Sequence, residues 1–245
     1  MTGWGLVLCE GAHEVEFLST LLAVSRSWNV EKGFYVPGSS PAPKSDRFRT
    51  LTDSGVPASK DPARHVLADL GGVDNVLGKR GEELLRNMGN SPACVAFVID
   101  ADSIGIGQRH QAVTELWKKA GLPEASTPRL GEVVVGKPGS GLWIAPDCSS
   151  EGTLDSLIVQ AAEAVNADRV RVARQFIRDL AAVDEHSWGA YELKATAGAI
   201  GQRWLAGASL ATALTKREGW MTPEIATAPP FAALIDFLVR VSGRL

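Results

Sequence analysis

The chain has few residues of the kinds that mark secreted, membrane-spanning or thiolate-bound metal proteins. Its three cysteines stand at Cys9, Cys94 and Cys148 and form no CxxC pair. This spacing indicates neither a disulfide framework nor a zinc site, and it is typical of a reducing compartment. No apolar run approaches the roughly 20 residues that span a bilayer. Glu10 and Glu14 interrupt the first apolar stretch, which therefore does not resemble a signal peptide. We expect a cytoplasmic protein with no membrane partner.

Charge and motif content exclude further classes. The formal net charge is −3 and the pI is near 5.9, so a nucleic-acid partner would need a local basic patch. No GxSxG, HExxH or GxGxxG motif is present, and the glycine-rich segment 136–141 lacks the residue order of a phosphate-binding loop. The four histidines are scattered along the chain. The sequence therefore gives no basis for a catalytic triad or a histidine-based metal site.

Two apolar segments each run directly into carboxylates. Gly5–Cys9 leads into Glu10, and Cys94–Ile99 leads into Asp100 and Asp102. Uninterrupted apolar runs are typical of parallel strands buried on both faces, and ligands bind beyond the carboxyl ends of such strands. Carboxylates gathered there would repel by roughly 4 kcal/mol per pair at about 4 Å, which a divalent cation relieves. We therefore expect a phosphoryl-transfer site for Mg²⁺, with Mn²⁺ able to substitute.

The remaining pattern predicts an α/β core over residues 1–150 and a helical C-terminal extension, residues 151–245, packed on it in the same globular unit. The proline- and glycine-rich segment 33–62 is expected to be a long, partly mobile loop. Further strands are expected at 132–135 and 141–145. Helical spacing of apolar residues predicts helices at 12–25, 62–70, 81–88, 108–120, 153–164, 168–183, 191–206 and 230–241.

The acidic strand ends resemble the motifs of the Toprim domain, the catalytic module shared by topoisomerases, primases and overcoming-lysogenization-defect (OLD) nucleases. The resemblance rests on Val7–Leu18 and Val98–Asp102. Two later stretches, Gly141–Asp155 and Glu192–Ala206, resemble stand-alone bacterial Toprim-like proteins of the DUF3226 and DUF4435 type. The resemblance implies a Rossmann-like Toprim core with a mostly parallel sheet, and magnesium-dependent phosphodiester chemistry. The chain between the two acidic motifs is longer than in a minimal Toprim domain.

The resemblance also implies roles for individual residues. Glu10 would act as general acid or base, or as a metal ligand, and Asp100 and Asp102 would be metal ligands. Lys194 would stabilise charge that develops on a transferring phosphoryl group. Most lysines on helices are simply solvated, and that interpretation stays open for Lys194.

Three further acids are candidate metal ligands at the same sheet edge. Glu14 lies one helical turn after Glu10, where it could equally complement the helix dipole. Asp147 and Asp155 follow the strand predicted at 141–145. A two-metal nuclease needs more carboxylates than the first three supply. The alternative is that Asp147 and Asp155 are turn and helix-start residues.

Two groups of basic residues are candidate nucleic-acid contacts, because basic side chains in a row can follow a phosphate backbone. They are Lys44, Arg47 and Arg49 in the predicted loop, and Arg171, Arg174 and Arg178 on the predicted helix 168–183. For the helix, an ion-paired solvent face with Asp168 and Asp179 is the alternative.

The first functional hypothesis is a Mg²⁺-dependent nuclease that cleaves DNA or RNA, in DNA maintenance or anti-phage defence. The alternative is a non-catalytic Toprim-fold module that binds nucleic acid, nucleotide or a partner ATPase. A third hypothesis is the toxic effector of a two-protein system. A topoisomerase is not expected, because Tyr35 and Tyr191 are the only tyrosines and no tyrosine-bearing breakage domain is recognisable.

Overall fold

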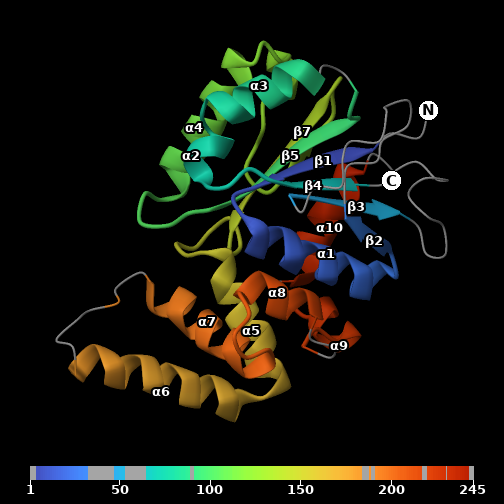
Figure 1. Cartoon of the computed structure of the whole chain (residues 1–245). Coiled ribbons are helices and arrows are strands. Elements are labelled where there is room, and N and C mark those ends of the chain that lie inside the picture. Colours follow the sequence, from blue (N-terminus) through green and yellow to red (C-terminus); the bar gives the residue numbers. More distant parts are fainter. Residues whose placement is uncertain are drawn as a thin grey trace.

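The computed structural model describes residues 4–32, 47–52, 65–88, 91–183, 188, 191–216, 220–229 and 231–242. These residues form a mixed sheet with helices on both faces (Figure 1). The strand order is β2-β3-β4-β1-β5-β7-β6. The strands are β1 (Gly5–Cys9), β2 (Asn29–Lys32), β3 (Phe48–Thr52), β4 (His65–Asp69), β5 (Cys94–Asp100), β6 (Val133–Val134) and β7 (Gly139–Ala145).

The centre of the sheet is parallel and its edges are antiparallel. Strands β4, β1, β5 and β7 run in the same direction, whereas β2, β3 and β6 run against their neighbours. After β1 the chain reaches β4, which pairs with one edge of β1, and it later forms β5, which pairs with the other edge of β1. The connections therefore diverge at β1, and such a divergence opens a crevice at the carboxyl ends of the strands.

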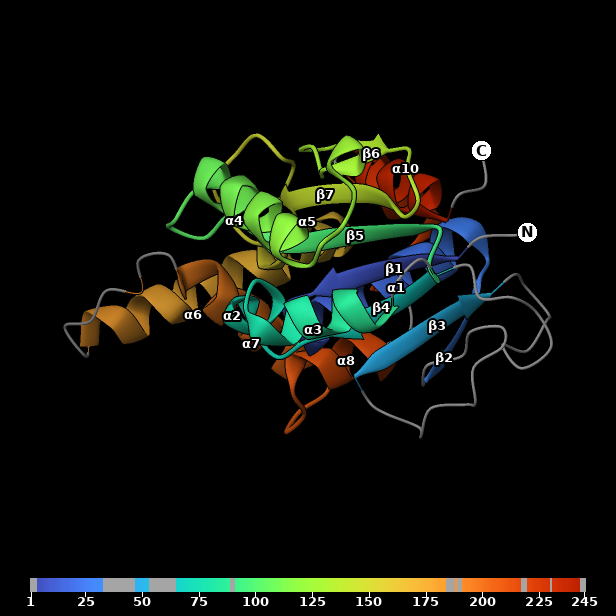
Figure 2. The ribbon, with the colours of Figure 1, turned by 90° about the horizontal axis from the view of Figure 1, so that it is seen from above.

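Helices cover both faces because successive strand residues point to opposite sides. Val7 and Val98 face one core, with α1, α5 and α10, while Leu8 and Phe97 face the other, with α3 and α4 (Figure 2). The helices are α1 (Ala12–Arg26), α2 (Val73–Val76), α3 (Lys79–Met88), α4 (Ile106–Lys119), α5 (Leu154–Val165), α6 (Ala167–Val183), α7 (Glu192–Trp204), α8 (Leu210–Lys216), α9 (Pro223–Thr227) and α10 (Phe231–Val241), with a 3₁₀ turn, η1, at Glu124–Ser126.

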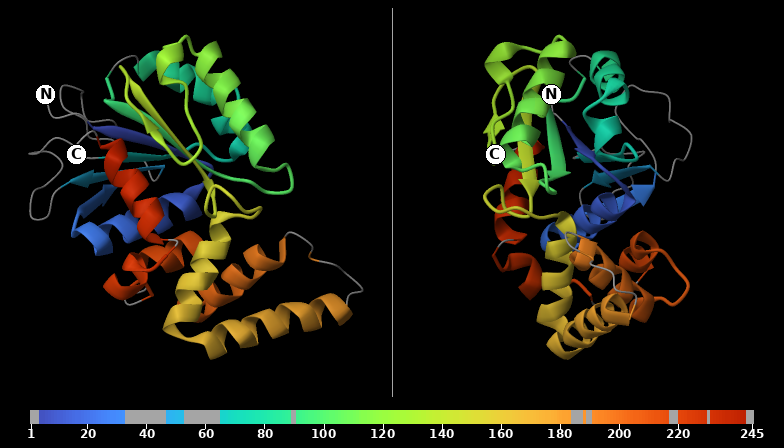
Figure 3. Two further views of the ribbon diagram at one scale, coloured as in Figure 1. Left: turned by 180° about the vertical axis from the view of Figure 1, so that it is seen from behind. Right: turned by 90° about the vertical axis from the view of Figure 1, so that its left-hand side faces the viewer.

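The C-terminal helices pack in two different places, on the sheet and beyond its strand ends. Helix α10 returns to the sheet, where Phe237 packs on Trp143 of β7 with ring centroids 5.6 Å apart. Helices α5, α6 and α7 pack on one another and extend away from the sheet on the side of the strand ends (Figure 3). This arrangement carries the N-terminus of α7 back toward the strand ends, and it is what positions the site.

The expectation of an α/β fold with a mostly parallel central sheet is confirmed. Two predictions for the region before β5 are wrong. The segment 62–70 contains the strand β4 instead of a helix, and the predicted loop 33–62 contains the strand β3. The apolar run His65–Ala68 is too short for periodicity to separate helix from strand. Pairing with β1 decides the matter, since Leu6 lies in register with Val66 and both are fully buried.

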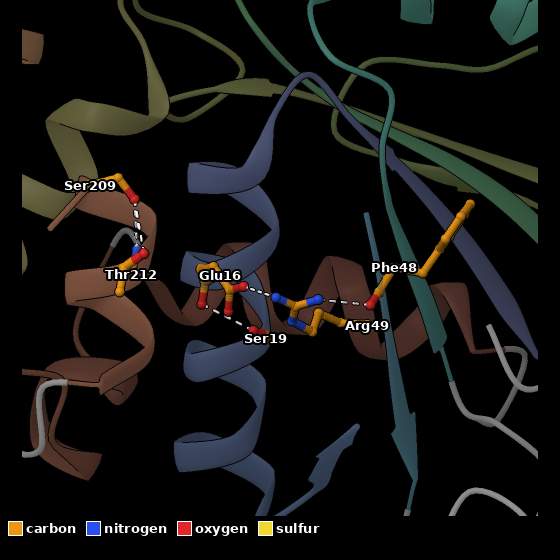
Figure 4. A network of polar contacts seen from close by, with 6 residues as sticks. All are labelled: Glu16, Ser19, Phe48, Arg49, Ser209 and Thr212. Carbon is orange, nitrogen blue, oxygen red and sulfur yellow. Dashed lines mark hydrogen bonds and ion pairs between the residues drawn. The ribbon is translucent and has the colours of Figure 1, made fainter. Parts of the chain in front are cut away.

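Arg49 is not on the surface, so its assignment to a nucleic-acid contact does not fit the structure. It is buried in β3, forms an ion pair with the buried Glu16 of α1, and donates a 2.9 Å hydrogen bond to the Phe48 carbonyl oxygen (Figure 4). Arg47 is exposed, and its carbonyl oxygen accepts from the Asp69 amide at 2.8 Å. Lys44 lies outside the described residues. The Arg49 side chain fastens β3 to α1.

Arg49→Met is expected to lower the free energy of unfolding by about 3 kcal/mol, because it leaves the Glu16 carboxylate buried without its partner. Replacing both residues, as Glu16→Leu with Arg49→Met, should recover most of that loss, since the buried Glu16 charge is removed together with its partner. Urea unfolding at pH 7 measures both, and Arg171→Met on α6, whose side chain is 71% exposed, is the control. Equal losses for the single and double variants would contradict this account.

In the part of the chain that the structure describes, none of the helices combines the length and the apolar character needed to cross a membrane.

Candidate functional site

A pocket of about 580 Å³ lies where β1 and β5 end. Its walls are the strand ends and the first turns of α1, α5 and α7. Six of the seven residues predicted as catalytic or metal-binding line it: Glu10, Glu14, Asp100, Asp102, Asp155 and Lys194. Five carboxylic acids thus share one cavity with one lysine.

Backbone amides fix the two acids that end the strands. The Asp100 amide donates to Glu10 Oε1 at 2.7 Å, and the Leu154 amide at the start of α5 donates to Asp100 Oδ1 at 2.7 Å. The Gly72 amide, beyond β4, donates to the Glu10 carbonyl oxygen at 2.5 Å. Each carboxylate is therefore held in place by one of its two oxygens. Among the described residues, no hydrogen bond engages the second oxygen of Glu10 or Asp100.

A buried arginine holds the turn between the two aspartates. Arg109 Nε donates to the Asp100 carbonyl oxygen at 3.1 Å, and Nη2 lies 2.8 Å from Asp102 Oδ2. Asp102 adopts a left-handed backbone conformation with φ of 49°, which aspartate tolerates better than most residues. Its amide donates to the Gly152 carbonyl oxygen at 3.1 Å. These contacts tie the end of β5 to the segment that enters α5.

Asp155 has a buried oxygen that is suited to bind a ligand. The residue is only 4% exposed, yet Oδ1 has no hydrogen-bond partner among the described residues. A buried carboxylate oxygen without a partner costs free energy. Burial raises the pKa of Asp155, while electrostatic interactions with Lys194 and His13 oppose that rise. A cation or a hydrogen-bond donor in the pocket would satisfy this oxygen.

Burial in the pocket raises the pKa values of Glu10, Glu14 and Asp100, as it does that of Asp155. Burial, with the charges of Glu10 and Glu14 second, raises the pKa of Asp100 to about 9. Burial is also the largest cause that raises the pKa of Glu10 to about 7, ahead of the repulsion by Glu14 and Asp102. The pKa of Glu14 is raised chiefly by burial as well. Shifts of this kind, several in one cleft, are typical of functional sites.

Helix N-termini add positive potential to the same cavity. The first turns of α1, α5 and α7 line it, through Ala12, Thr153 and Tyr191 among others. No side chain caps these helices at their own N-cap positions. Amides in a first turn lack partners within the helix, and together with the helix dipole they favour anions. The pocket thus combines carboxylates suited to a cation with helix ends suited to a phosphate.

The carboxylates fit Mg²⁺ by chemistry but are not drawn together into a finished set of ligands. Hard cations such as Mg²⁺ prefer carboxylate oxygens, and Asp155 has an oxygen in need of a partner. In the described residues, however, no three Asp, Glu, His or Cys side chains lie close enough together to hold a metal ion. A metal here would have to draw the acids of the pocket toward it.

Asp147 does not belong to the pocket. Its carboxylate closes the turn after β7 by accepting from the amides and hydroxyls of Ser149 and Ser150 at 2.7–3.0 Å. Burial is the largest single cause and raises the pKa of Asp147, but the four hydrogen bonds together outweigh it and the pKa is lowered overall. Asp147 therefore lies in a turn and bonds to that turn, as the alternative interpretation has it.

Arg171, Arg174 and Arg178 of α6 are all ion-paired, but only Arg171 pairs with an acid that the alternative interpretation named. Arg171 pairs with Asp168 at 3.3 Å, on the solvent side of the helix. The other two reach neighbouring helices: Arg174 pairs with Glu163 of α5 at 3.4 Å, and Arg178 with Glu192 of α7 at 3.0 Å. Arg174 and Arg178 also line a second cavity next to the acidic pocket.

Two residues of the site were not among the sequence-based candidates. Arg109 carries no sign of its role, because an arginine near the start of a helix is normally a surface residue. Tyr191 lies at the rim of the pocket and is 70% exposed. An aromatic residue just before a helix that carries Lys194 is a weak signal, and only the folded chain brings Tyr191 to the strand ends.

Fold and site together define an α/β protein with an acidic, partly buried pocket at the carboxyl ends of parallel strands. The chain belongs to the family described as DUF3226, protein of unknown function, whose sequence profile matches residues 5–238. No curated protein and no solved structure matches the chain. The predicted membership in the DUF3226 family is thereby confirmed, and membership in the wider Toprim superfamily stays a prediction.

Proposed function

We propose that this protein is a Mg²⁺-dependent phosphodiester hydrolase with a Toprim-like fold that acts on nucleic acid. The observation that carries the proposal is the pocket itself. Glu10 and Asp100 end adjacent parallel strands, and the buried Asp155, with its unpartnered oxygen, faces the same cavity. Burial, together with the close packing of these acids, raises the pKa values of Glu10 and Asp100. Several shifted pKa values in one cleft are typical of a functional site.

Each residue has a role that follows from its position. Bound Mg²⁺ would supply charge neutralisation and activation of water, and Asp100, Asp102 and Asp155 would hold it. Glu10, with a pKa near 7, is suited to accept and return a proton near neutral pH. Lys194 would stabilise negative charge on the reacting phosphate. Arg109 does not line the pocket, and it positions Asp100 and Asp102 through the Asp100 carbonyl oxygen and the Asp102 carboxylate.

A non-catalytic module that binds nucleic acid, nucleotide or a partner ATPase is the second candidate. One observation favours it, which is that the described acids do not form a preassembled metal site. Both candidates could bind a metal ion, so metal binding has to be measured together with cleavage to tell them apart.

The test is calorimetric titration of Mg²⁺ and Mn²⁺ into the wild-type protein and into Asp100→Asn/Asp155→Asn, followed by incubation of both with plasmid DNA and total tRNA. The expected result is metal binding and metal-dependent cleavage by the wild type, with both lost in the double variant. Asp147→Asn, outside the pocket, is the matched control and should behave as the wild type. Metal binding without cleavage of either substrate would favour the non-catalytic module.

A further inference from the structure

A second cavity of about 500 Å³ adjoins the acidic pocket. The two cavities share Asp102, Ser103 and Thr153 as lining residues, so they meet along the turn after β5 and the entry to α5. Arg174 and Arg178 of α6 also line the second cavity. A ligand longer than one phosphate could therefore pass from the acids to the arginines without leaving the recess.

Both arginines keep hydrogen-bonding capacity despite their ion pairs. Only Nε of Arg178 bonds Glu192, at 3.0 Å, and the side chain is 63% exposed. Arg174 uses its two terminal nitrogens on Glu163, each at 3.4 Å. A guanidinium carries five N–H donors and binds phosphate with a fork geometry. Arg178 is therefore the better placed of the two to contact a phosphate.

An exposed aromatic ring stands next to both cavities. Tyr191 lines the acidic pocket and is 70% exposed, and the following residue, Glu192, lines the second cavity. Nucleic-acid bases stack on such rings, at about 1–3 kcal/mol per base, without sequence preference. Stacking needs an unpaired base, so a ring in this position favours a single strand over a duplex.

The recess has few basic groups. The net charge of the chain is −3, and the acids Asp102, Glu151 and Glu192 line the second cavity beside the two arginines. Arg171, the third arginine of α6, lines neither cavity and pairs with Asp168. A duplex held along both strands needs many phosphate contacts, whereas two arginines, one lysine and one aromatic ring match a short single-stranded segment.

We propose that the joined recess is the binding groove for single-stranded nucleic acid. One phosphodiester lies in the acidic pocket beside Lys194, the neighbouring phosphate lies against Arg178 and Arg174, and a base stacks on Tyr191. This inference rests on the proposed hydrolase, since it names the substrate class of that site. The groove itself does not depend on catalysis.

The test is fluorescence anisotropy with a labelled single-stranded oligonucleotide of about ten nucleotides, a typical site size for such proteins. The protein carries Glu10→Gln in every sample so that no substrate is consumed. Arg174→Gln/Arg178→Gln is expected to weaken binding about tenfold or more and to reduce the salt slope by about 0.7, for one lost phosphate contact on a single strand. Arg171→Gln, on the same helix, should change neither. Tyr191→Ala should weaken binding about tenfold and Tyr191→Phe hardly at all.

The single variant Arg178→Gln removes a mostly exposed side chain, so its result does not depend on any damage to folding that Arg174→Gln causes. Equal affinities of Arg178→Gln and its parent, equal weakening by Arg171→Gln, or tighter binding of duplex than of single strands would overturn the groove. Binding that depends on Arg178 while the wild type cleaves nothing would keep the groove and overturn the hydrolase. Cleavage at the same rate with and without the Arg178 and Tyr191 side chains would keep the hydrolase and overturn the groove.

Discussion

Glu10→Gln is expected to lower the rate of metal-dependent phosphodiester cleavage by about a thousandfold, a typical loss for a group that transfers a proton in the reaction. Glu10 is the pocket acid whose pKa, at about 7, suits proton transfer at neutral pH. Glutamine keeps an oxygen that can accept the hydrogen bond of the Asp100 amide, so the end of β1 should stay in place. Cleavage of whichever substrate the wild type accepts, measured under saturating Mg²⁺, provides the rate.

The control for this experiment is Glu83→Gln, an exposed acid on α3 whose partner is Lys79. It removes the same charge far from the pocket and should leave the rate unchanged. Thermal melting of both variants establishes that they fold. A Glu10→Gln protein that cleaves as fast as the wild type would show that the site is assigned wrongly.

Asp100→Asn is expected to stabilise the metal-free protein at pH 8 by about 3 kcal/mol, which raises the melting temperature by about 6–12 °C for a chain of this size. Folding raises the pKa of Asp100 from 3.8 to about 9. A raised pKa means that the folded state favours the protonated acid, so the stabilisation present below pH 4 is lost as the pH rises toward 9. Each pKa unit corresponds to about 1.4 kcal/mol, so the expected 3 kcal/mol is about half of what the full shift would give.

Asparagine cannot ionise, so the variant should lose this pH dependence. Its side-chain oxygen can still accept from the Leu154 amide, which keeps the start of α5 in place. The measurement is the melting temperature between pH 5 and pH 8 in the presence of a chelator. Asp147→Asn should not gain stability over this range, because the pKa of Asp147 is lowered. A wild type and an Asp100→Asn protein with parallel pH profiles would rule out a strained acid at this position.

The two predictions describe one trade-off. Acids that destabilise the metal-free fold are retained where function needs them. A stabilised but inactive Asp100→Asn protein would therefore support both the strain and the proposed chemistry.

Much of the site could be predicted because strand ends are local features. An apolar run that stops at Glu10 or Asp100 is visible in a few residues, and a parallel sheet brings such ends to one edge. Asp155 and Asp147 were equally good candidates by sequence. Only the fold separates them, since Asp155 enters the pocket on the first turn of α5 while Asp147 bonds its own turn.

Other features depend on contacts between residues far apart in the chain. Arg49 and Glu16 pair across 33 positions, and nothing in the basic segment around Arg49 indicates a buried side chain. The strand β4 was mistaken for a helix because its assignment depends on pairing with β1. The second cavity exists because α6 and α7 fold back toward the end of β5.

The sequence by itself determined the α/β class, the family, and the acids that end β1 and β5, because apolar periodicity and abrupt strand ends are encoded within short segments. The tertiary structure decided which further acids join them, which arginine is structural, and where Arg174, Arg178 and Tyr191 lie relative to the pocket. Burial, pKa shifts and shared cavities arise only when distant segments pack together, and a linear pattern does not carry that information.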